Sequence, residues 1–134
     1  MGIRRALGVP MPSAMPEIHI LVVDDDPAVN AYVCGVLRKA GYQVEPAADL
    51  AEAAALAREK PLDVLVSDVV LGPVDGLDVE EAVRVIRPAV KTIFMSGYAK
   101  PRYRSGDDDP VLVKPFEPAE LLARVESLVG DSRL

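Results

Sequence analysis

The chain has 134 residues, of which half are hydrophobic and only 4% aromatic, so we expect one domain with an aliphatic core. The net charge of −6 argues against binding to nucleic acid, which needs a basic face, and against attachment to a membrane of anionic lipid. No apolar stretch is long enough to cross a bilayer, and Cys34 is the single cysteine, so no internal disulfide can form and a cytoplasmic location is expected.

The first 16 residues contain prolines at positions 10, 12 and 16 after a short apolar run. These prolines interrupt the run, so a secretory signal is not expected. We interpret residues 1–16 as an N-terminal extension or leader, with Met15 as an alternative start, and residues 17–134 as the domain.

From Ile18 onward, short apolar runs alternate with patterns of helical periodicity. We predict strands over residues 18–23, 43–47, 63–67, 91–95 and 111–113, and helices over residues 27–40, 50–59, 77–87 and 118–129. Such alternation is typical of βαβ units around a parallel sheet. The predicted fold class is therefore α/β.

Polar residues and glycine mark the ends of the predicted helices. Asp26 is the expected N-cap of the first helix, with Pro27 at its first position and Gly41 after its end. Asp49 is the expected N-cap of the second helix, and Glu52 completes a predicted capping box. One apolar stripe of the first helix is predicted to face the core: Val29, Val33, Val36, Leu37 and Ala40.

Residues 97–110 are unfavourable for a regular helix. They contain two glycines, two prolines and the acidic run Asp107–Asp109. The fourth helix of the alternation is therefore predicted to be short or absent.

Four of the apolar runs end in reactive polar residues. The carboxyl ends of parallel strands lie along one edge of a sheet, where ligand sites form. The residues at these ends are Asp24 to Asp26, Asp68, Ser96 and Lys114. Carboxylates, a hydroxyl and an ammonium at one edge suit a metal ion and a phosphoryl group.

This ordered set of residues resembles the receiver domains of two-component response regulators. The resemblance extends from about Ile18 to Val129 and includes Asp24-Asp25, Asp68, Asp75-Gly76, Ser96 and Lys114-Pro115-Phe116. It implies a doubly wound sheet of five parallel strands in the order 2-1-3-4-5, as in flavodoxin.

The resemblance also implies a role for each residue. Asp68 matches the phosphoacceptor, Asp25 the direct ligand of Mg²⁺, and Asp24 its partner, which often acts through water. The backbone carbonyl of Val70 matches a third protein ligand. Ser96 matches the switch hydroxyl, and Lys114 the lysine that pairs with the phosphoryl group. The chemistry agrees, because three clustered acids repel an anionic phosphoryl group unless a hard cation such as Mg²⁺ lies among them.

Several positions depart from the family pattern. Gly72 and Pro73 replace a proline that many receivers have four residues after the phosphoacceptor, and Val111 replaces the switch aromatic. The segment from Phe94 to Ala99 is similar to receivers of hybrid histidine kinases and to receivers without a regular fourth helix. By this similarity, Tyr98 is expected to supply the aromatic ring that is missing at Val111. Since neither Val70 nor Tyr98 orients a hydrolytic water readily, a long-lived phosphoryl group is expected.

The resemblance implies a sensor histidine kinase or a histidine phosphotransfer protein as donor, and a downstream protein as target. No DNA-binding or enzymatic domain follows Val129 in this sequence, so output through protein contacts or onward phosphotransfer is expected. The chain is expected to catalyse its own phosphorylation and dephosphorylation without being a turnover enzyme. It can be a stand-alone regulator or a receiver from a hybrid kinase or larger regulator.

An alternative is a small phosphatase of the haloacid dehalogenase type. Asp24-x-Asp26 after an apolar strand resembles its nucleophile motif, with Asp24 as nucleophile, but Ala28 and the missing acidic pair after Lys114 weaken that likeness. A third alternative, a scaffold of the same fold that is never phosphorylated, is disfavoured by the complete set of acids, hydroxyl and lysine.

Overall fold

The computed structural model of the chain describes residues 17–97 and 111–133, with side chains as far as Gly130. The predicted leader, Tyr98 and nearly all of the segment predicted to lack a regular helix lie outside these residues. The described elements, in chain order, are β1 (His19–Val23), α1 (Pro27–Lys39), β2 (Gln43–Ala47), α2 (Leu50–Glu59), β3 (Val64–Asp68), β4 (Val70–Leu71), β5 (Val74–Asp75), α3 (Gly76–Ile86), β6 (Lys91–Ser96), β7 (Leu112–Val113) and α4 (Pro118–Arg133).

Five strands form one parallel sheet in the order β2-β1-β3-β6-β7. Strand β1 pairs with both β2 and β3: Val22 of β1 lies opposite Pro46 of β2 and Val66 of β3. Because β4 and β5 stand outside the sheet, this is the arrangement 2-1-3-4-5 of the sequence prediction, which is confirmed.

The sequence prediction assigned no strand or helix to the segment between Asp68 and Leu77, and the structure differs there. Here β4 and β5 pair as a short antiparallel hairpin, with Val70 opposite Asp75 and Leu71 opposite Val74. Gly72 lies in its turn with φ of 64°, a conformation that glycine adopts without a steric penalty. Strands of two residues are too short to show a periodic pattern, so the sequence did not reveal them.

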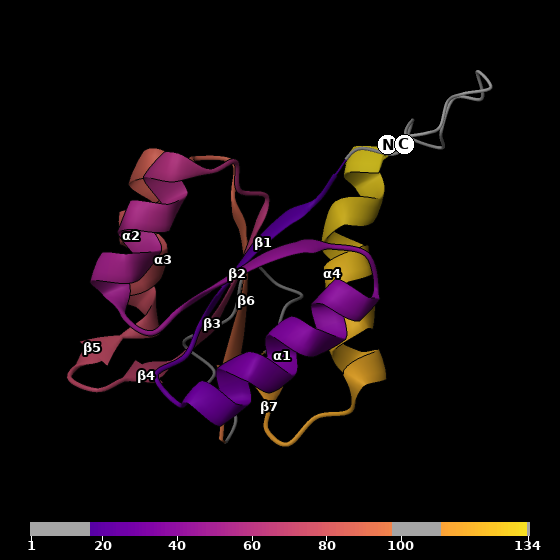
Figure 1. Cartoon of the computed structure of the whole chain (residues 1–134), viewed down its shortest axis with the longest axis horizontal. Helices are drawn as coiled ribbons and strands as arrows, with labels where there is room; N and C mark the ends of the chain where they lie inside the picture. Colours follow the sequence, from indigo (N-terminus) through magenta and orange to yellow (C-terminus); the bar gives the residue numbers. More distant parts are fainter. Residues whose placement is uncertain (1–16, 98–110, 134) are drawn as a thin grey trace.

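The sheet lies between two layers of helices (Figure 1), α1 and α4 on one face and α2 and α3 on the other. Alternate residues of β1 point to the two faces: Ile20 and Val22 join the core under α1 and α4, while Leu21 and Val23 join the core under α2 and α3. The helices contribute mainly aliphatic side chains to these cores, among them Val33, Leu37, Leu121, Val125, Ala53, Ala57, Val79 and Val83.

The predicted starts of the helices agree closely with the structure, but α4 continues to Arg133, past the predicted end at Val129. The Asp26 carboxylate caps α1 by accepting the N–H groups of Ala28 and Val29, and Gly41 has a φ of 103°. At α2 the capping box is shifted: Asp49 accepts the Glu52 N–H as predicted, but the Glu52 carboxylate accepts the N–H of Ala48, one residue earlier. Both bonds still satisfy N–H groups near the helix start.

Among the helices of residues 17–97 and 111–133, none combines the length and the hydrophobicity needed to cross a lipid bilayer.

Candidate functional site

The structure brings the predicted polar residues to one edge of the sheet. Asp24 follows β1 directly, Asp68 ends β3, Ser96 ends β6 and Lys114 follows β7. The strand register places Asp68 opposite Met95 and Ser96 opposite Val113. The strands are parallel, so their carboxyl ends all open onto the same region.

Three carboxylates form the acidic cluster of this region: Asp24, Asp25 and Asp68. Each offers an oxygen within 4.8 Å of the oxygens of the other two. Asp24 is only 1% exposed, Asp25 is exposed and Asp68 is intermediate. Hard oxygen ligands that converge in this way, with one side open to water, fit a Mg²⁺ ion, which usually retains part of its hydration shell.

Lys114 supplies the positive charge of the site. Its Nζ lies 3.1 Å from Asp24 Oδ2 and 3.2 Å from Asp68 Oδ2, so the ammonium bridges two acids that come from different strands. The Lys114–Pro115 peptide bond is cis. The Lys114 N–H donates to the Ser96 carbonyl at 2.7 Å, which links the lysine to the end of β6.

The pKa values of the bridged groups reflect burial and pairing. Burial raises the pKa of Asp24 above 3.8, although the Asp26 N–H and the Lys114 ammonium oppose the shift. Burial alone would lower the pKa of Lys114, but hydrogen bonds and charge attraction from Asp24 and Asp68 outweigh it and the pKa is raised. The ammonium therefore stays charged at neutral pH.

The backbone around Asp68 is closely packed. The Ser67 hydroxyl donates to the Asp68 carbonyl at 2.9 Å, and the Val70 N–H donates to Asp68 Oδ1 at 3.3 Å. A Cβ at Gly76 would lie 2.5 Å from the Asp68 carbonyl oxygen, so only glycine fits there without a shift. The family resemblance assigns the backbone carbonyl of Val70, the first residue of β4, as a metal ligand, and that role stays a prediction.

The predicted switch residues are only partly described. Ser96 is buried at the end of β6. Val111, at the position of the family's aromatic residue, is buried in a small apolar cluster with Val69 and Phe94. Tyr98 lies outside the described residues, so its role as the missing ring stays a prediction.

Sequence reasoning missed one polar residue beside the site. Asn30 of α1 is only 7% exposed and lies in the buried stripe of the helix, with Val33, Cys34 and Leu37. The sequence did contain a signal for this residue, namely its helical spacing from those apolar residues. A polar residue within an apolar stripe must find hydrogen-bond partners in the core.

Within the described residues, hollows lie on two sides of the acidic cluster. One, of about 550 Å³, is mainly apolar and is lined by Ala28, Val29, Tyr32, Lys114, Pro115 and Phe116. The other, of about 480 Å³, lies between α1 and the end of β2 and includes Asp24, Asp25 and Asn30.

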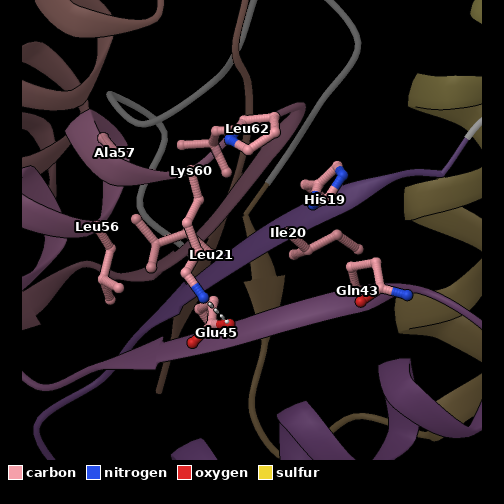
Figure 2. Close-up of a pocket in the computed structure, with 10 residues that line it drawn as sticks. His19, Ile20, Leu21, Gln43, Glu45, Leu56, Ala57, Lys60 and Leu62 are labelled. Atoms are coloured by element: carbon pink, nitrogen blue, oxygen red, sulfur yellow. Dashed lines mark hydrogen bonds and ion pairs between the residues drawn. The ribbon is translucent and has the colours of Figure 1, made fainter.

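A smaller cavity, of about 110 Å³, lies away from the acids, between the starts of β1 and β2 and the end of α2. Figure 2 shows the Lys60–Glu45 ion pair, 2.9 Å long, beside this cavity. Of the predicted site residues that the structure describes, none lines it.

Comparison with known proteins agrees with this geometry. Residues 20–126 match the family model of the response regulator receiver domain. The response regulator receiver protein CpdR of Brucella abortus is 30% identical over 115 residues, which are 83% of this chain and 96% of that protein. The receiver domain of the hybrid histidine kinase CckA superposes with a TM-score of 0.71 at 32% identity, over 83% of this chain and 98% of that one.

The transcriptional regulatory protein PrrA of Mycobacterium tuberculosis is 37% identical over 89% of this chain, but the match covers only 53% of PrrA. The chain thus spans nearly all of one curated relative and about half of another. Fold, site geometry and family model agree, and the chain belongs to the response regulator receiver domain family.

Proposed function

We propose that the chain accepts a phosphoryl group from a phosphohistidine onto Asp68, with Mg²⁺ held by Asp24, Asp25, Asp68 and the Val70 carbonyl. The observation that carries this proposal is the place of the Asp68 carboxylate, which belongs to the acidic cluster and is bonded to the Lys114 ammonium at 3.2 Å. A nucleophile between a cation site and an ammonium is suited to attack an anionic phosphoryl group.

The burial of the acids favours Asp68 as the nucleophile. Its side chain is 14% exposed, whereas that of Asp24 is fully covered. An Asp68 carboxylate oxygen forms a bond to phosphorus as the bond from phosphorus to the donor's imidazole nitrogen breaks, which leaves an acyl phosphate on the protein and a free histidine on the donor. Lys114 pairs with the phosphoryl oxygens, and Mg²⁺, when bound, supplies the second positive charge.

The surroundings support a protein as the phosphoryl donor. The apolar hollow next to Lys114 includes Tyr32, which is 48% exposed although it is large and aromatic. An exposed aromatic residue and an apolar hollow beside a reaction centre are suited to contact with another protein surface. We assign this contact to a sensor histidine kinase or a histidine phosphotransfer protein.

The output of the domain follows from its chemistry. Phosphorylation of Asp68 changes the charge next to Ser96, the proposed switch hydroxyl, and Tyr98 is the proposed ring that responds. The change would alter contacts with a downstream protein. On this proposal the chain catalyses its own phosphorylation and dephosphorylation and is not a turnover enzyme.

Neither the structure nor the comparisons favour the phosphatase alternative. The matched family model is the receiver domain, and Asp24, the nucleophile of that alternative, has a fully covered side chain that is engaged by Lys114. The covered and bonded Asp24 carboxylate is suited to act as a metal ligand that is held in place. It is less suited to act as a nucleophile, which must reach a substrate.

The proposal is tested by incubation with acetyl phosphate and MgCl₂, followed by intact-protein mass spectrometry. We expect addition of one phosphoryl group that requires Mg²⁺ and is lost in Asp68→Asn. The control Asp49→Asn, which alters only the cap of α2, should be labelled like the unchanged protein. Undiminished labelling of Asp68→Asn would contradict the proposal, and hydrolysis of a generic phosphomonoester that disappears in Asp24→Asn would favour the phosphatase.

A further inference from the structure

Asn30 is a buried polar side chain that the proposed phosphoryl transfer does not use. It lies in the first turn of α1, and its side chain enters the core beside the carboxyl ends of β1 and β2. A buried carboxamide is costly unless its hydrogen bonds are made, so its partners show what it holds in place.

Three backbone carbonyls surround the Asn30 amide nitrogen. Nδ2 lies 3.0 Å from the Ala47 oxygen, 3.2 Å from the Asp24 oxygen and 3.3 Å from the Val22 oxygen. On the other side of the amide, Oδ1 accepts from Cys34 Sγ at 3.2 Å. The carboxamide therefore ties α1 to the ends of two neighbouring strands, at the point where β1 leads into the acidic cluster.

The bond to the Asp24 carbonyl bears directly on the metal ligands. A peptide unit is planar, so the carbonyl oxygen of Asp24 lies in one plane with the Cα atoms of Asp24 and Asp25. A donor that holds this oxygen restricts the rotation of the plane and thereby the direction of both side chains. The Asp24 N–H also donates to the Ala47 carbonyl at 3.1 Å, and Asn30 holds that same carbonyl.

We propose that Asn30 is a positioning residue for the Asp24–Asp25 pair: its carboxamide fixes the peptide plane between the two acids and so sets their carboxylates for Mg²⁺. This inference depends on the proposed function, because it assumes that the acidic cluster binds Mg²⁺. Groups that orient metal ligands without touching the metal commonly change metal affinity by 10- to 100-fold when they are removed.

The test measures the Mg²⁺ dissociation constant of the full chain by isothermal titration calorimetry with MgCl₂. Asn30→Leu keeps a similar volume but removes the donor, and we expect its dissociation constant to rise about tenfold. Val33→Ala is the matched control, because it also weakens the packing of α1 but removes an aliphatic side chain that has no hydrogen-bond donor. We expect its dissociation constant to stay within about twofold of that of the unchanged protein.

Each outcome decides the inference. An unchanged dissociation constant in folded Asn30→Leu would overturn it, as would an equal rise in Val33→Ala, which would show that helix packing alone affects the metal site. If Asn30→Leu does not fold, Asn30→Ser, which keeps one donor, should show a smaller rise, and no rise would overturn the inference. If the unchanged protein binds no Mg²⁺, the proposed function itself fails.

Discussion

Asp24 and Asp25 are neighbours in the chain, but their surroundings differ sharply. Asp25 is exposed, whereas Asp24 is buried and bonded to the Asp26 N–H and to Lys114. Burial holds the pKa of Asp24 in the folded protein above 3.8. A carboxyl whose pKa is raised by folding stabilises the fold below its unfolded pKa, and this contribution is lost as pH rises through the folded pKa. At pH values above the folded pKa, the ionised Asp24 therefore lowers the stability of the metal-free protein.

From this we predict opposite effects of Asp24→Asn without and with metal. At a pH above the folded pKa of Asp24, the metal-free variant should have a higher melting temperature, because a buried charge is removed. Mg²⁺ at a hundred times its dissociation constant should stabilise the unchanged protein by about 2.7 kcal/mol and should add almost nothing to the variant. Thermal unfolding followed by circular dichroism, with and without MgCl₂, measures both effects.

The control for that experiment is Glu59→Gln, at the exposed end of α2, which should change neither melting temperature nor Mg²⁺ response. A lower melting temperature of metal-free Asp24→Asn would contradict the argument from burial, since it would show that the bond to Lys114 outweighs the cost of the buried charge.

At the scale of elements, the start of α3 supports the phosphoacceptor strand. The Gly76 N–H donates to the Val69 carbonyl at 2.8 Å, and the glycine itself packs against the Asp68 carbonyl. The hairpin of β4 and β5 returns the chain from Asp68 to this contact. The position of the Asp68 backbone therefore depends on a residue eight positions later in the sequence.

Gly76→Ala should destabilise the protein by about 1–3 kcal/mol, because the new Cβ would lie 2.5 Å from the Asp68 oxygen and one of the two must move. It should also slow labelling by acetyl phosphate. Gly35→Ala is the matched control: it lies within α1 with no atom near its Cβ position, and it should stabilise the protein by up to about 1 kcal/mol. Urea unfolding measures the free energy of unfolding of both variants. Equal effects of the two changes would refute the close contact between Gly76 and the Asp68 carbonyl.

The elements also show how far local pattern predicts structure. The bounds of β2 and α2 agree with the prediction, and β3 differs by one residue, because strands and helices leave their own period in the sequence. The hairpin after Asp68 was not predicted, since two-residue strands have no period, and the second half of the α2 capping box reached Ala48 instead of Asp49.

At the scale of the whole molecule, an aliphatic core packs against each face of the sheet. The core under α1 and α4 joins side chains from both helices and from β1, β3, β6 and β7. Leu121 of α4 is fully buried within it, although α4 follows the last strand and lies far from β1 in the sequence. The stability of this face therefore depends on helices from opposite ends of the domain.

We predict that Leu121→Ala costs about 2–5 kcal/mol of unfolding free energy, the range for a leucine truncated in a closed core. Val85→Ala, at a position that is 78% exposed on α3, should stay within about 0.5 kcal/mol of the unchanged protein. Urea unfolding monitored by circular dichroism compares the two, and a small effect at Leu121 would show that α4 contributes little to the core.

The sequence by itself determined the order of the helices and of the five sheet strands, the pairing order of those strands and the polar residues at their ends. Each of these follows from residues close together in the chain or from an ordered motif of the family. Only the tertiary structure decided that Asp24 is buried while Asp25 is not, that Lys114 bridges Asp24 and Asp68, and that Asn30 holds three carbonyls. Lys114 and Asp24 are 90 residues apart in the sequence, and no local sequence pattern predicts a hydrogen bond over that separation.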